Sequence, residues 1–293
     1  MFEPFDYEFF IRGIIAATIV GGLCGLIGVY VVLRKMSYIG HGLSHAIFGG
    51  AVVSFVMSFN FYIGATIWGF ASAVLINLTT RQRKFIAADA AIGIITTASF
   101  ALGVALISRY RTFTRSFDAA LFGNILGVTE NDLYAIVGVT VLTVAAILIM
   151  YRRLLFTTFD PEVAPYFGVS TAWVDTFFSL ILAAAIVVSL QVLGATLIAA
   201  TLVIPPITAR LLTDNFSRMM VFSVAIGSAC GFTGIYASYF IDIASGASIV
   251  LVSAGVFLVA MLYSVVRNTV LTARGLAEPV PVDSSVSQHA VYD

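Results

Sequence analysis

The sequence has very little charge. Only 10% of its 293 residues are charged, whereas an ordinary soluble domain has about 25%. Hydrophobic residues make up 60% of the chain and its mean hydropathy is +1.03, so it lacks the charge needed to cover a soluble surface. This excludes soluble enzymes and free nucleic-acid-binding proteins, and disordered chains are excluded because they are polar rather than apolar. The composition is typical of an all-α protein that crosses a membrane several times.

Residue types that carry chemistry are also scarce. Cys24 and Cys230 lie inside apolar runs, so they predict packing rather than a disulfide. The sequence has no Gly-x-x-x-x-Gly-Lys-Ser/Thr phosphate loop, no His-Glu-x-x-His motif and no Gly-x-Ser-x-Gly motif. The chain therefore has no recognisable means of hydrolysing ATP, and we expect that it is not an enzyme.

Long apolar stretches are what the sequence has instead. A spanning helix needs about 20 apolar residues, and nine stretches approach or exceed this length. They are 10–33, 38–59, 61–80, 89–108, 133–151, 172–190, 192–212, 219–241 and 247–266. The Phe59-Asn60-Phe61 turn is very tight and Pro205-Pro206 interrupts the seventh stretch. We therefore expect a bundle of eight or nine transmembrane helices between residues 10 and 270, the first of them retained rather than cleaved as a signal peptide.

The distribution of basic residues predicts the orientation. In the nine-helix arrangement eleven of the 15 basic residues fall on one side, which the positive-inside rule makes cytoplasmic. They are Arg34, Lys35, Arg81, Arg83, Lys84, Arg152, Arg153, Arg210, Arg218, Arg267 and Arg274. Residues 1–9 are then extracytoplasmic. Residues 271–293 form a cytoplasmic tail that is too polar to build a core and is expected to be disordered. Arg12, Arg109, Arg111 and Arg115 lie on the other side, and the pattern assigns them no role.

Away from the ends of the predicted spans almost no ionisable residues occur, and the exceptions are two histidines. His41 and His45 are four residues apart, so both rings lie on one helix face, with Ser44 beside them. Ionisable groups are expensive inside a membrane and are candidates for function. Neutral imidazole is a common metal ligand, and two rings supply half of a tetrahedral site. Two alternatives stay open: each ring bonds a neighbouring helix, or the pair relays protons.

A polar segment between two predicted spans is a candidate docking surface. The coupling loop is placed near residues 154–170, on the side that carries Arg152 and Arg153. Asp160 can cap a short helix that begins with Pro161 and includes Glu162, and Gly168 can end it. Such a helix would present a surface to a cytoplasmic partner, although an ordinary loop fits the same pattern.

Prolines and glycines inside the apolar stretches predict local packing. Pro205 and Pro206 remove backbone donors and are expected to disrupt their helix, either as a hinge or as a packing kink. The pairs Gly21/Gly25 and Gly227/Gly231 have the four-residue spacing that lets helices approach closely. Packing within one chain is favoured over a contact between two copies.

An ordered set of short motifs resembles the zinc/manganese/iron ABC-transporter permeases, the ABC-3 family. The set covers about residues 10–270. It consists of Val31-Val-Leu-Arg-Lys-Met-Ser37 with Gly40-His-Gly-Leu-Ser-His-Ala46, Asp89-Ala-Ala-Ile-Gly93, Leu121-Phe-Gly-Asn124, Asp160-Pro-Glu162, Gly194 with Ile204-Pro205 and Thr208-Ala-Arg210, and Tyr239-Phe-Ile-Asp242 with Ser245-Gly246.

The resemblance implies a prokaryotic plasma-membrane protein that works as a homodimer. Two ATP-binding subunits would dock on Asp160–Gly168, an extracytoplasmic protein would deliver the metal, and the ion would pass His41 and His45. His41 stands where the family usually has Asp, and a nitrogen ligand suits Zn²⁺ better than Mn²⁺. No cofactor is expected to be bound permanently, since the metal ion is the cargo.

Three classes of function remain to be compared. The leading expectation is the membrane subunit of an ATP-driven importer of divalent transition metals, with zinc slightly ahead of manganese and iron also open. A secondary transporter or channel driven by an ion gradient is the main alternative, but it would need ionisable residues in several spans. A membrane-bound metal sensor or scaffold is the third. A stoichiometric ATPase partner distinguishes the first class from the other two.

Overall fold

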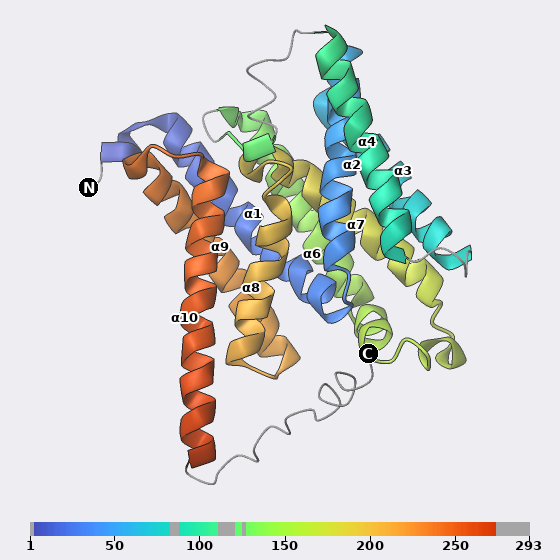
Figure 1. Cartoon of the computed structure of the whole chain (residues 1–293), viewed down its shortest axis with the longest axis vertical. Helices are drawn as coiled ribbons and strands as arrows, with labels where there is room; N and C mark the ends of the chain where they lie inside the picture. The colour runs from blue at the N-terminus through green and yellow to red at the C-terminus, as the bar shows by residue number, and fades with distance from the viewer. Residues whose placement is uncertain (1–2, 83–87, 111–120, 125–126, 274–293) are drawn as a thin grey trace, which may run out of the picture.

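A computed structural model describes residues 3–82, 88–110, 121–124 and 127–273, and this part of the chain is helical. The helices are arranged as a bundle (Figure 1). They are α1 (Glu8–Leu33), α2 (Ser37–Val56), α3 (Phe61–Gln82), α4 (Ala88–Tyr110), α6 (Glu130–Phe159), α7 (Thr171–Leu193), α8 (Ile198–Leu212), α9 (Phe216–Ile241) and α10 (Ser245–Ala273), with the short 3-10 helices η1 (Glu3–Asp6) and η3 (Ala164–Phe167). The predicted tail from residue 274 onward, Arg111 and Arg115 lie outside the described residues.

Successive helices run in opposite directions between the two ends of the bundle (Figure 1). We call these the Arg34 end, where α1 stops, and the Gly123 end, where α1 starts. Helix α10 also stops at the Arg34 end, so the first and last described helices have their outer termini at opposite ends. Among the described residues, eight helices are long and apolar enough to cross a membrane. The expected bundle of eight or nine membrane helices is confirmed.

Helix α8 is the exception in length, and it corrects one expectation. The stretch 192–212 is divided by Gly194, which ends α7, and the remaining helix has 15 residues. Pro205 and Pro206 do not break this helix but lie inside it. Pro206 has no N–H to donate to the carbonyl of Leu202, four residues earlier. That carbonyl faces Gly28 of α1, where a Cβ atom would come within 2.0 Å of it, so this part of α8 packs directly against the backbone of α1.

Helix α1 is the centre of the bundle. In its most apolar window 78% of the residues are buried, compared with 17% in α10, so α10 is left to face lipid or a partner. Glycines let α1 and α9 approach closely, because Cβ atoms at Gly21 and Gly231 would meet backbone oxygens of the other helix at 2.2 and 2.3 Å. The Ser223 hydroxyl also donates to the Gly25 carbonyl over 2.7 Å. The prediction that these glycines pack within one chain is confirmed, and Cys24 and Cys230 are buried and unpaired as expected.

Side-chain caps decide where several helices begin. Thr129 and Asp132 form a capping box that starts α6 three residues before the predicted span. Asp132 is buried at 7% exposure, and it also accepts a 2.6 Å bond from the Tyr62 hydroxyl. Helix α6 then continues to Phe159, so the loop predicted near 154–170 begins only at Asp160. The longer helix follows from residues 152–159, which extend the helical pattern past the apolar stretch.

The Gly123 end brings together motifs that are far apart in the sequence. Gly123 and Gly194 both have positive φ, and a Cβ at Gly194 would lie 2.3 Å from the carbonyl oxygen of Leu121. The same oxygen accepts a 2.6 Å bond from the Thr196 hydroxyl. A Cβ at Gly246 would be 2.5 Å from the carbonyl of Leu193. Only glycine permits these approaches, so three of the motifs that resemble the ABC-3 family serve one packed junction.

Candidate functional site

The two histidines of α2 form a close pair. The ring centroids of His41 and His45 are 4.7 Å apart and nearly perpendicular, and the His45 ring packs edge-on against Phe100 of α4 at 5.1 Å. His41 is exposed and His45 is half-buried. The Nδ1 atom of His45 is buried and has no hydrogen-bond partner. An unpaired buried nitrogen is costly, so this atom is available for a ligand that the neighbouring helices do not supply.

A small cavity opens beside the pair, between α2 and α4. Its volume is about 230 Å³, and it is lined by Tyr38, His41, Gly42, His45, Thr96, Thr97 and Phe100. Gly42 lets the two helices come together, since a Cβ there would lie 2.8 Å from side-chain atoms of Ile92 and Thr96. The cavity is large enough for an ion with part of its water shell.

Ser44 faces away from this cavity. Its side chain is completely buried, and its hydroxyl donates a 2.7 Å bond to the carbonyl of His41. That bond satisfies the hydroxyl within its own helix, so Ser44 could bind a metal only by breaking it. Among the described residues no group of three or more His, Cys, Asp or Glu side chains could hold a metal ion. If the pair binds a metal ion, it can supply only two ligands, and the others would have to come from water, backbone or another chain.

The predicted docking segment lies at the Arg34 end and has a different form from the one expected. Asp160 is the C-cap of α6, and its backbone carbonyl, rather than its side chain, accepts from Ala164. The short helix is η3, which starts at Ala164 instead of Pro161. Its end is as predicted, because Gly168 has a left-handed φ of 74° and donates to the carbonyls of Ala164 and Pro165. Pro165 is the second residue of η3, where the first turn of a helix leaves backbone N–H groups unbonded and a residue without an N–H fits well.

The segment presents an exposed surface on a firm base. Ala164 is completely buried, whereas Tyr166 is 89% and Phe167 is 73% exposed. Asp160, Pro161 and Glu162 are exposed as well. Beside the segment is a hollow of about 190 Å³ lined by Arg153, Gly168, Val169, Ser170, Trp173 and Val174. Exposed aromatic side chains next to a hollow are typical of protein–protein contact surfaces.

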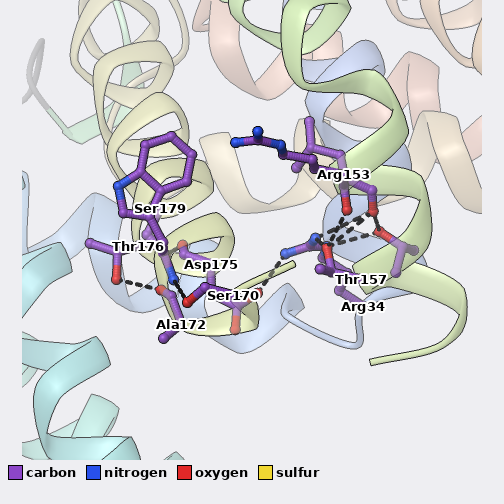
Figure 2. Close-up of polar contacts among 11 residues, drawn as sticks. Arg34, Arg153, Thr157, Ser170, Ala172, Asp175, Thr176 and Ser179 are labelled. Atoms are coloured by element: carbon purple, nitrogen blue, oxygen red, sulfur yellow. Dashed lines mark hydrogen bonds and ion pairs between the residues drawn. The ribbon is translucent and has the colours of Figure 1, made fainter. Parts of the chain in front are cut away.

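Arg34 holds the two flanks of this segment together (Figure 2). Its Nη1 donates to Asp175 of α7 over 2.8 Å, and its Nε donates to Thr158 of α6 over 2.9 Å. Its Nη2 donates to the Thr157 hydroxyl and, over 3.4 Å, to the carbonyl of Leu154. The guanidinium thus joins the end of α1, the end of α6 and the start of α7. We call these contacts the Arg34 network.

The Arg34 network is deeply placed. The Arg34 side chain is 5% exposed and that of Asp175 is 35% exposed, and the guanidinium lies 5.2 Å from the centre of the Phe178 ring. Burial lowers the pKa of Arg34 below its usual value, and the Asp175 carboxylate opposes this shift. Since arginine stays protonated in proteins, the Arg34 guanidinium keeps its positive charge. From the sequence, Arg34 was predicted only to lie on the cytoplasmic side and within one family motif, and these contacts were not predicted. A signal was present, because Asp175 is an acidic residue inside the predicted span 172–190.

Three comparisons with known proteins agree with this architecture. The family model described as the ABC 3 transport family matches residues 6–264. The chain belongs to the ABC 3 transport family. It is therefore a permease subunit, and the expectation that this chain is not itself an enzyme is confirmed. ATP hydrolysis takes place in a separate ATP-binding subunit.

Individual relatives match over most of their length. The manganese transport system membrane protein MntC of Listeria monocytogenes is 36% identical, over 88% of this chain and 92% of the relative. The chelated iron transport system membrane protein YfeC of Yersinia pestis is 32% identical, over 90% of this chain and 89% of the relative. The solved structure of PsaBC from Streptococcus pneumoniae in complex with Fab has a chain with a TM-score of 0.79 and 33% identity, covering 87% of this chain and 91% of that one.

Proposed function

We propose that this permease is the membrane subunit of an ATP-driven importer of divalent transition metal ions, and that His41 and His45 bind the ion in transit. The observation that carries the proposal is the unpartnered, buried Nδ1 of His45, which lies beside a second imidazole and a cavity. Neutral imidazole is a good ligand for such ions. The names of the relatives, which refer to manganese and chelated iron, support the same class of cargo.

The structure supports a second copy as the source of the remaining ligands. His41 is exposed on a helix that is long and apolar enough to span a membrane, and an ionisable side chain facing lipid is expensive. A homodimer that covers this face of α2 would remove the cost. Two-fold symmetry would then place two more imidazoles opposite the first pair, and four nitrogens suit tetrahedral Zn²⁺.

The choice among metals follows from the ligand types. Two imidazole nitrogens with no carboxylate grouped with them in the described part of the chain favour Zn²⁺, whereas Mn²⁺ prefers oxygen ligands. The relatives' names favour manganese and iron instead. We place zinc slightly first, with manganese and iron as direct competitors in the same uptake experiment.

The remaining partners follow from the two ends of the bundle. Described basic residues such as Arg34, Arg153 and Arg218 lie at the Arg34 end, which supports a cytoplasmic position for that end and an outside N-terminus. Cytoplasmic ATP-binding subunits would dock on the exposed segment Asp160–Gly168. An extracytoplasmic metal-binding protein would deliver the ion at the Gly123 end. The complex would lie in a prokaryotic plasma membrane.

The test combines partner capture with transport. The tagged permease is purified from its native membrane, its stoichiometric partners are identified, and the complex is placed in proteoliposomes with its metal-binding protein. We expect an ATPase partner and ATP-dependent uptake of Zn²⁺, Mn²⁺ or Fe²⁺, which is lost in His45→Ala. Uptake that needs an ion gradient but no ATP would support a secondary transporter instead. Wild-type uptake by His45→Ala would show that the pair is structural.

A further inference from the structure

The corner between α1 and α2 is built on Arg34. Helix α1 ends at Leu33, and α2 begins at Ser37 after three residues. The corner is closed by backbone bonds, because the N–H groups of Arg34, Lys35 and Met36 donate to carbonyls of α1 over 2.9, 3.1 and 2.8 Å. Lys35 has a left-handed φ of 57°, a conformation that costs energy for a residue with a Cβ. The corner is thus a rigid piece fixed to α1, and Arg34 is its anchor.

The same corner sets the position of the histidine pair. His41 is four residues after Ser37, which is about one helical turn, or roughly 6 Å along the axis. A helix transmits a displacement of its first turn to the following turns as a rigid body, because each turn is bonded to the next. His41 and His45 will therefore move with the corner.

On its other side Arg34 contacts both flanks of the docking segment. Thr157 and Thr158 precede the segment and Asp175 follows it, and all three accept from the same guanidinium. A shift of the segment toward or away from a docked partner must move these acceptors together. The guanidinium is planar and its five donors are fixed relative to one another, so the shift is passed to the α1–α2 corner instead of being absorbed by rotation of a single bond.

We propose that Arg34 is a positioning residue that couples the docking segment Asp160–Gly168 to the metal-binding histidines of α2. This proposal rests on the function proposed above and adds a role for a residue that touches neither the metal nor the exposed docking surface. Arg34 links movement of the docking segment to the distance between this histidine pair and the same pair in the second copy of the permease. Without this link, a docked ATPase can hydrolyse ATP while the histidines stay in place.

Arg34→Lys is the sharpest variant. It keeps the charge and can still meet Asp175, but one ammonium cannot reach that carboxylate and both threonine hydroxyls in the planar arrangement. In proteoliposomes we expect the complex to assemble and its ATPase rate to stay close to that of wild type. The number of metal ions imported per ATP should fall about five-fold or more, the low end of typical coupling effects. Arg267→Lys is the matched control, because Arg267 is exposed near the end of α10, and its coupling ratio should be unchanged.

A milder variant keeps the proposal testable if Arg34→Lys fails to fold. Thr158→Val is nearly isosteric and removes one acceptor on the α6 side of the network. It should assemble normally and lower the coupling ratio by about two-fold, the low end of what single mutations in a coupling network produce. A wild-type coupling ratio in a folded Arg34→Lys complex would overturn the proposal. So would a fall in uptake that only follows loss of the ATPase, or an unfolded Arg34→Lys together with wild-type coupling in Thr158→Val.

Failure of this proposal can be told from failure of the proposed function. If the wild-type permease captures no ATPase or imports no metal with ATP, the function itself is wrong, and this is known before any variant is measured. If the wild type imports metal and the Arg34 variants keep its coupling ratio, only the role of Arg34 is rejected.

Discussion

The histidine pair and the Arg34 network are two polar clusters of the bundle, and they differ in how completely their polar atoms are hydrogen-bonded. The guanidinium of Arg34 has four acceptors around it and is 5% exposed. The buried Nδ1 of His45 has no hydrogen-bond partner, and the neighbouring His41 is exposed. A fully bonded cluster stabilises one arrangement of helices. A partly bonded cluster next to a cavity is prepared for something that arrives from outside.

Loss of the His45 imidazole should have the strongest consequence, and it tests whether the histidine pair binds the transported ion. His45→Ala should abolish metal uptake, because one imidazole per copy cannot complete a site that has no third described ligand. The complex should still assemble. The substitution removes the ring contact with Phe100, but the buried Nδ1 of His45 has no hydrogen bond to lose. Uptake assays on proteoliposomes and gel filtration of the purified complex measure the two readouts. A variant that fails to assemble would place His45 with the structural residues.

The next effect concerns stability on the other side of the comparison. Arg34→Ala should lower the free energy of unfolding by about 2–4 kcal/mol, because it strips Asp175 and two threonine hydroxyls of a charged donor. The partial exposure of Asp175 lets water replace some of what is lost. Thermal unfolding in detergent should show a clearly lower midpoint than for His45→Ala. Equal midpoints for the two variants would remove the distinction between the clusters.

A smaller effect is expected on the surface that the Arg34 network supports. Glu162 is exposed on the docking segment, so Glu162→Lys should change the free energy of unfolding by no more than about 0.5 kcal/mol. ATPase stimulation and metal uptake should both fall, since the charge of the contact surface is reversed. Arg267→Glu is a control away from the segment, with a charge change of equal size and opposite sign. Normal ATPase turnover in Glu162→Lys would reject docking at this surface.

The mildest change concerns Ser44 and tests whether its hydroxyl belongs to the histidine site. Ser44 lies between the two histidines in sequence, but its hydroxyl is bonded to the carbonyl of His41. Ser44→Ala should therefore leave the metal concentration for half-maximal uptake close to that of the wild type. The measurement is the concentration of Zn²⁺ or Mn²⁺ that gives half-maximal uptake. A large increase in that concentration would show that the hydroxyl leaves its own helix to bind the ion.

Hydrophobicity was enough to predict most of the helices. The apolar stretches are long because backbone groups in a bilayer must be bonded within their own segment, and this constraint is visible without any tertiary contact. The end of η3 at Gly168 was predictable for a similar reason, since its left-handed φ of 74° favours glycine. The position of Pro205 and Pro206 inside an unbroken helix could not be predicted from that helix alone, because the close approach of Gly28 is a contact between helices.

The membrane class, the eight or nine helices, the family resemblance and the adjacency of His41 and His45 follow from the amino-acid sequence alone, because they depend on composition or on spacing within one segment. Three other features required the packed fold: Ser44 turns away from the cavity, three glycine-containing motifs meet at the Gly123 end, and Arg34 reaches α6 and α7. Arg34 and Asp175 are 141 residues apart in the chain. Contacts of that kind depend on how helices pack, and no periodicity within a single helix encodes them.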